Sequence, residues 1–138
     1  MLVLVDTPIW SLGLRRIASD LNPRERRLVN ALQELIGDGR AQIIGPVRQE
    51  LLSGVRDETV FRRLRAELRA FDEPPLDISD YEDAAQIHNE CRSHGLAGSA
   101  IDFLICAAAV RRNWQIFTTD QDFTRYATAV RLILYQVS

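Results

Sequence analysis

Four acidic residues that lie far apart in the chain are the side chains best suited to chemistry: Asp6, Glu50, Asp102 and Asp120. Each stands where an apolar, strand-like run ends, or just inside the helix that follows such a run. In an open parallel sheet those places share the edge at which α/β proteins bind ligands. Crowded carboxylates repel one another unless a cation lies between them, and oxygen ligands suit a hard ion such as Mg²⁺. The four positions therefore predict a metal-dependent hydrolase that acts on phosphate esters.

The elements that must position these acids alternate between strand and helix patterns. Apolar runs predict strands at residues 2–5, 41–44, 115–118 and 131–137. Helical spacing and capping signals predict helices at 22–36, 47–52, 57–71, 79–95 and 98–112, and a short one within 120–127. Such an alternation indicates βαβ units, and therefore an α/β fold with a mostly parallel sheet and helices on both faces.

Composition restricts the class of protein. A chain of 138 residues, 46% of them hydrophobic and 26% charged, fits one globular domain spanning residues 1–138. No apolar stretch approaches the roughly 20 residues of a membrane-spanning helix, and the N-terminus lacks the marks of a signal peptide, so we expect a cytoplasmic protein. All 17 basic residues are arginine, so a P-loop, which needs a lysine, is excluded. A net charge of −2 means that any nucleic-acid contact must come from a local patch.

Each acid also has a structural interpretation. Asp6 could cap the turn that follows the first strand, and Glu50 could be an exposed helix residue. Ser99 and Asp102 match a capping box, although the apolar neighbours of Asp102 favour a partner or a metal for its carboxylate. Asp120 and Asp122 occupy a loop where acids commonly form turns. The convergence of the four positions on one edge outweighs these separate interpretations.

Other groups of residues give weaker support for a functional site. The spacing of His88, Cys91 and His94 on one helix carries the first and third side chains apart, so a zinc site is not favoured. Cys91 and Cys106 are expected to be small buried hydrophobes. No pattern supports a serine or cysteine nucleophile. Arginines at positions 24, 26 and 27, and at 62, 63, 65 and 69, are most simply solvated helix faces, with RNA contact as the alternative.

Four motifs, in order, resemble the PIN-domain family, and more closely its VapC-type toxins. They are VDTPIW at 5–10, VRQELLSG at 47–54, GSxxDxLIxAxA at 98–109 and TxDxDF at 118–123. The resemblance implies a PIN-like three-layer α/β/α fold with four to five strands. It also implies a Mg²⁺-dependent endoribonuclease, with Mn²⁺ as an alternative ion, that a cognate VapB-type antitoxin holds inactive.

The resemblance assigns roles to particular residues. Asp6, Glu50, Asp102 and Asp120 match the acidic quartet that is both catalytic and metal-binding, and Asp122 matches a further acid that is less regularly required. Many relatives have serine where this chain has Pro8, which leaves Thr7 or Thr118 to supply a nearby hydroxyl. A homodimer and an antitoxin groove lined by early helices are also implied. Trp10 and its neighbours, or the apolar side of the 57–71 helix, could serve that contact, with core packing as the simpler role.

Three rival functions remain to be weighed. A phospho-accepting receiver domain uses a lysine, and this chain has none. A phosphatase with an aspartyl nucleophile expects an acid two residues after the first, where Pro8 stands. The remaining rival is a catalytically silent PIN-like protein that binds RNA or acts as a scaffold, and the complete acidic quartet argues against it.

Overall fold

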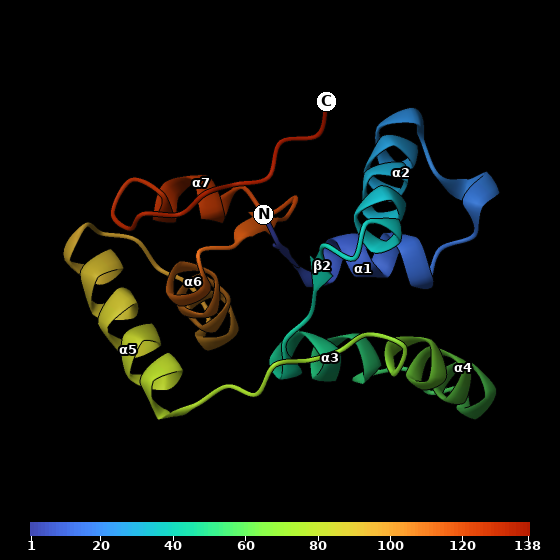
Figure 1. The fold of residues 1–138 in the computed structure, drawn as a ribbon, viewed down its shortest axis with the longest axis horizontal. Helices are drawn as coiled ribbons and strands as arrows, with labels where there is room; N and C mark the ends of the chain where they lie inside the picture. The colour runs from blue at the N-terminus through green and yellow to red at the C-terminus, as the bar shows by residue number, and fades with distance from the viewer.

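A computed structural model describes all residues, 1–138, as one α/β arrangement (Figure 1). The strands are β1 (Val3–Val5), β2 (Ala41–Gln42) and β3 (Gln115–Phe117). The helices are α1 (Thr7–Leu14), α2 (Pro23–Gly37), α3 (Gly45–Leu52), α4 (Glu58–Leu68), α5 (Ile78–Ser93), α6 (Ala100–Arg112) and α7 (Asp122–Tyr126), with a 3₁₀ turn at Ala18–Asp20.

The sheet is parallel throughout, in the order β2-β1-β3. Val5 pairs with Phe117, so β1 and β3 end side by side. In Figure 1 the strands run between α5 and α6 on one side and α1 and α2 on the other. This arrangement confirms the predicted parallel α/β fold, and it brings the segments that follow β1 and β3 to one edge of the sheet.

The core explains why these elements hold their positions. All three residues of β1 are completely buried, as expected for a central strand covered on both faces. Trp10 of α1 is also fully buried, and its indole N–H donates to the carbonyl of Val5 at 3.0 Å. Cys91 and Cys106 are free, buried thiols, as predicted. No helix is both long and apolar enough to pass through a bilayer.

Three predicted features differ from the structure. The expected four to five strands are three, because the segment 131–137 contributes only an isolated parallel bridge between Ile116 and Leu134. Strand β2 keeps two of the four residues predicted for it. Helix α5 begins after Asp77 rather than at Ser79, since Asp77 and Asp80 form the capping box themselves.

A buried ion pair fixes the start of α5 against the end of α6. The Asp80 side chain is fully buried, and its two carboxylate oxygens accept from Arg112 at 2.7 and 2.9 Å. These hydrogen bonds hold the pKa of Asp80 well below its usual range, although burial opposes the shift. Because the native pKa is lowered, the pair stabilises the fold above the ordinary pKa of an aspartate and loses that effect in strong acid.

Replacing Asp80 by asparagine is expected to lower the free energy of unfolding by about 2 kcal/mol, because a buried charge-assisted pair is lost. The matched control is Asp83→Asn, because Asp83 lies on the same helix and its longer 3.5 Å contact with Arg111 is partly exposed, whereas Asp80 is fully buried. Urea denaturation at pH 7 measures both. Equal midpoints for Asp80→Asn and the unmodified chain would contradict the assignment.

Candidate metal centre

Asp6 lies at the end of β1 and caps α1. Its carboxylate is buried, with 6% of the residue exposed, and Oδ1 accepts from the backbone N–H of Thr7 at 2.8 Å. The other oxygen, Oδ2, accepts from the hydroxyl of Thr118 at 2.7 Å. The capping role considered from the sequence is therefore real, but it engages only one of the two carboxylate oxygens.

Thr118 connects the ends of β1 and β3. Its hydroxyl donates to Asp6 and accepts from the backbone N–H of Asp120 at 3.0 Å. Thr7, the other hydroxyl proposed from the sequence, has a buried oxygen with no hydrogen-bond partner. Of the two threonines, Thr118 is the one that orients an acid.

Asp102 lies in the first turn of α6. Its backbone N–H donates to the Ser99 hydroxyl at 3.1 Å, as a helix cap requires. Its carboxylate does not complete the capping box, because Oδ2 instead accepts from the hydroxyl of Tyr126 at 2.9 Å. A methyl group at Gly98 would overlap the Tyr126 hydroxyl and would lie 2.7 Å from the ring of Phe103. The glycine therefore gives Tyr126 the room to reach Asp102.

Three acids meet closely enough to share one ion. One carboxylate oxygen from each of Asp102, Asp120 and Asp122 lies within 4.8 Å of the other two. In each carboxylate one oxygen accepts a hydrogen bond. The donor is the Tyr126 hydroxyl for Asp102, the backbone N–H of Asp122 for Asp120, and the Arg125 side chain for Asp122. The second oxygen of each has no hydrogen bond from the chain. Three carboxylates this close together, each with one oxygen unbonded, fit a hard divalent cation.

Burial and mutual repulsion raise the pKa of two of these acids. Burial raises the pKa of Asp6 from 3.8 to about 6, and the charges of Asp102 and Glu50 act in the same direction. Burial is also the main reason for the raised pKa of Asp102, to which the charge of Asp120 adds. Hydrogen bonds from Thr118 to Asp6 and from Tyr126 to Asp102 oppose these shifts. A cation would relieve both repulsions.

The structure therefore divides the sequence-derived quartet. Asp102 and Asp120 lie in the close cluster, whereas Asp6 and Glu50 are outside it. Asp6 is nevertheless near enough for the charges of Asp102 and Glu50 to raise its pKa. Glu50, on α3, is exposed, and its side chain makes no hydrogen bond; its link to the site is the effect of its charge on Asp6.

Two features of the candidate site go beyond the sequence reasoning. Asp122, which the resemblance gave as a less regularly required acid, is a full member of the close cluster. Tyr126 was not singled out at all, since nothing in its local pattern shows a hydrogen bond to an acid 24 residues earlier. Its place four residues after Asp122, on the buried face of a short helix, was the only available signal.

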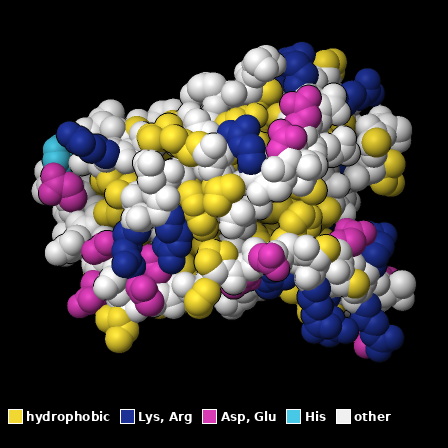
Figure 2. Space-filling view, in the orientation of Figure 1, with side chains coloured by type: hydrophobic (Ala, Val, Ile, Leu, Met, Phe, Trp, Pro, Cys, Tyr) yellow, Lys and Arg dark blue, Asp and Glu magenta, His cyan; other side chains and the backbone are white.

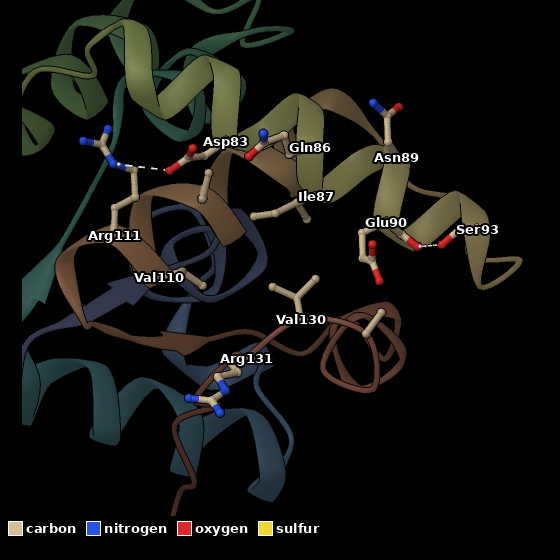
Figure 3. A pocket seen from close by; sticks show the side chains of 12 residues that line it. Asp83, Gln86, Ile87, Asn89, Glu90, Ser93, Val110, Arg111, Val130 and Arg131 are labelled. Atoms are coloured by element: carbon tan, nitrogen blue, oxygen red, sulfur yellow. Dashed lines mark hydrogen bonds and ion pairs between the residues drawn. The ribbon is translucent and has the colours of Figure 1, made fainter.

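A sizeable cleft of the molecule lies elsewhere. It has a volume of about 750 Å³ and lies between α5, α6 and the segment around Val130. Ile87, Val110 and Val130 point towards this space, and Arg111 pairs with Asp83 at its border (Figure 3). None of the four quartet acids lines it. Asp83 and Glu90 are the acids that line this cleft, so the close cluster of three acids lies outside it.

Replacing Thr118 by valine is expected to weaken Mn²⁺ binding about tenfold, because the hydroxyl that connects Asp6 to the backbone of Asp120, a member of the close cluster, is removed while the shape is kept. The matched control is Thr119→Val, since the Thr119 hydroxyl makes no hydrogen bond within the chain. Equilibrium titration with Mn²⁺ measures both. Equal affinities for the two variants would show that Thr118 has no orienting role.

Comparison with known proteins agrees with this fold. The family model for the PIN domain matches residues 3–129. FitAcB from Neisseria gonorrhoeae is 22% identical with a TM-score of 0.76, over 98% of this chain and 97% of that chain. VapBC2 from Rickettsia felis, solved bound to a DNA fragment from its promoter, is 20% identical with a TM-score of 0.77, over 98% of each chain.

A third similar structure is VapBC-5 from Mycobacterium tuberculosis, described as a member of the VapBC family of toxin–antitoxin systems. It is 17% identical with a TM-score of 0.65, over 99% of this chain and 100% of that chain. At such low identities these three likenesses establish a shared fold.

Proposed function

The chain belongs to the PIN domain family, and on this premise we propose that it is a Mg²⁺-dependent endoribonuclease that hydrolyses RNA phosphodiester bonds. Mn²⁺ is the expected substitute ion. We further propose that the enzyme is the toxin of a toxin–antitoxin pair. The single observation that carries the proposal is the group of three carboxylates within 4.8 Å, each with a free oxygen, beside the buried Asp6.

The proposed roles follow from the contacts of each acid. Asp102 and Asp120, with Asp122, would hold the cation, and Asp6 and Glu50 would complete the negative field around it. A divalent cation in such a site lowers the pKa of an attacking water and offsets charge on the phosphoryl oxygens. Thr118 and Tyr126 keep Asp6 and Asp102 in fixed orientations, so little reorganisation is needed when RNA arrives.

The proposed partners are a cognate VapB-type antitoxin and a second copy of the chain. The structural likeness to chains solved in VapBC complexes supports the antitoxin. The surfaces suggested from the sequence are only partly available. Trp10 is fully buried, and Leu64 and Leu68 on the apolar side of α4 belong to the core. Val60 and Phe61 on the same side of α4 are partly exposed and remain candidates for the antitoxin contact.

Removal of divalent metal is expected to stop cleavage. Purified protein should cut total RNA in the presence of Mg²⁺ and give no new ends with excess EDTA, because the carboxylates alone repel the phosphate backbone. Adding Mg²⁺ back should restore the same cleavage sites, which end mapping would identify. RNA that stays intact under all conditions, together with RNA binding, would favour the catalytically silent RNA-binding protein instead.

A further inference from the structure

A cleft of about 360 Å³ opens at the start of α2. Arg24 and Arg27 of that helix line it, together with Thr118 and Thr119 from the loop after β3 and the last residues of the chain, 135–138. We call it the arginine cleft. The apolar side chains of Leu28 and Phe117 also face it. The proposed function assigns no role to this cleft.

The arginine cleft lies directly beside the candidate metal centre. Thr118 belongs to both, because its hydroxyl donates to Asp6 while the residue lines the cleft. The bridge between Ile116 and Leu134 is parallel, so residues 135–138 lie at the same edge of the sheet as the segment that follows β3. A strand of nucleic acid with one phosphate at the acids would have its neighbouring nucleotides within reach of the cleft.

The two arginines of the cleft have no partner in the chain. Arg24 and Arg27 are exposed and make neither an ion pair nor a hydrogen bond with another residue, and their i, i+3 spacing places them on one face of α2. Arginine also gathers over α4 in Figure 2, but there Arg62 and Arg63 each lie within 4 Å of a glutamate. The guanidinium groups of the cleft are therefore available to bind an anion from outside.

The cleft also offers an aromatic ring. Tyr135 packs against Phe117 with ring centroids 5.0 Å apart at 51°, and it is only partly buried. Arginines for phosphates, an aromatic face for a base and a free threonine hydroxyl are the combination with which proteins hold single-stranded nucleic acid. An acidic protein segment would use the arginines but would gain little from the ring.

We propose that the arginine cleft binds the single-stranded RNA next to the bond that is cut. Arg24 and Arg27 contact backbone phosphates, and the ring of Tyr135 stacks on a base. This inference rests on the proposed function, because it places the RNA substrate of that same site. It adds the residues that hold the strand while the acids act on one phosphate.

Binding of a labelled single-stranded RNA, followed by fluorescence anisotropy in EDTA to prevent cleavage, tests the arginines. The double variant Arg24→Ala/Arg27→Ala is expected to bind about tenfold more weakly, and the slope of log K against log[salt] should fall by about 1.4, since two phosphate contacts are lost. Arg26→Ala is the matched control, because Arg26 is exposed on the same helix turn but does not line the cleft. It should match the unmodified chain within twofold.

The tyrosine has its own test in the same assay. Tyr135→Leu is expected to weaken RNA binding about tenfold with no change in the salt slope, because stacking and not charge is lost. Tyr135→Phe keeps the ring and should bind like the unmodified chain. Circular dichroism would confirm that both variants fold. If both variants bind equally well, the tyrosine does not stack on a base, and that part of the proposal is wrong.

The outcomes separate this inference from the proposed function. If the unmodified chain neither binds nor cuts RNA, the proposed function itself is wrong. If it does both, and the double variant binds as tightly as Arg26→Ala, the arginine cleft is not the RNA site. A double variant that keeps RNA binding but loses binding to a co-purified antitoxin would make the cleft a protein-binding surface and would equally overturn the inference.

Discussion

Asp102→Asn is expected to reduce the rate of RNA cleavage by about 10³-fold, because loss of this proposed metal ligand would remove about 4 kcal/mol of transition-state stabilisation. Asp102 is the critical acid because it belongs to the close cluster of three acids and also acts on Asp6. One of its oxygens lies within 4.8 Å of ligand atoms of Asp120 and Asp122, and its charge also raises the pKa of Asp6. Asparagine keeps the size of the side chain and an oxygen that can accept from Tyr126, so the fold should be retained.

Initial rates on a fluorogenic RNA, with thermal unfolding in parallel, measure this effect. Asp72→Asn is the matched control, since Asp72 is exposed and makes no hydrogen bond or ion pair. The control should cleave at the unmodified rate. A folded Asp102→Asn protein that cleaves within tenfold of that rate would remove Asp102 from the proposed mechanism.

Asp6→Asn is expected to stabilise the metal-free protein at pH 7 by up to about 3 kcal/mol, while it abolishes cleavage. The sign follows from the pKa of Asp6, which burial raises from 3.8 to about 6. The native state holds this proton more tightly than the unfolded state, so the free energy of unfolding falls as the pH rises from about 4 to about 6 and stays lower above that range. Asparagine cannot ionise, so the variant lacks the cost of a buried charge at this position.

Denaturation in EDTA between pH 4 and pH 8 tests the prediction. The unmodified chain and Asp6→Asn should be similarly stable near pH 4 and should diverge as the pH rises through about 6. Adding Mg²⁺ at pH 7 should stabilise the unmodified chain more than the variant, since a bound cation also favours the ionised Asp6 carboxylate, which the variant lacks. If Asp6→Asn is the less stable protein at pH 7 without metal, burial does not destabilise the ionised Asp6 carboxylate, and the prediction is wrong.

Much of the fold could be predicted because its signals are local. The buried run of β1 and the start of the helix predicted at 22–36 were confirmed, and an Asn22 capping box marks that start in the structure. The prediction of a strand at 131–137 was wrong. Its alternating apolar residues fit a strand, yet the segment pairs with β3 only at a single bridge. Strand pairing depends on a neighbouring backbone, which a local pattern does not specify.

The start of α5 shows a second limit of sequence reasoning. Asp77 and Asp80 have the same three-residue capping spacing as Ser79 and Glu82, so both pairs predict a helix start. The structure uses the first pair, since Asp80 must also be buried to meet Arg112. A contact with α6, remote in the sequence, decided between two locally equivalent caps.

The sequence predicted which edge of the sheet carries the candidate site, but not how the acids are arranged there. The end of a parallel strand brings Asp6 and the Thr118–Asp120 loop together, and the sequence sufficed for that. The finer division, in which Asp122 joins Asp102 and Asp120 while Glu50 stays exposed, depends on where α7 and α3 pack. The contact from Tyr126 to Asp102 depends on the same packing of α7.

Calorimetric titration of Mn²⁺ into the metal-free protein tests the assembly of distant acids around one cation most directly. We predict saturable binding to the unmodified chain and to Asp72→Asn, and its loss in Asp102→Asn, because Asp102 supplies an oxygen to the cluster. Absence of binding to the unmodified chain, or equal affinity for Asp102→Asn, would contradict the metal centre and the nuclease built on it.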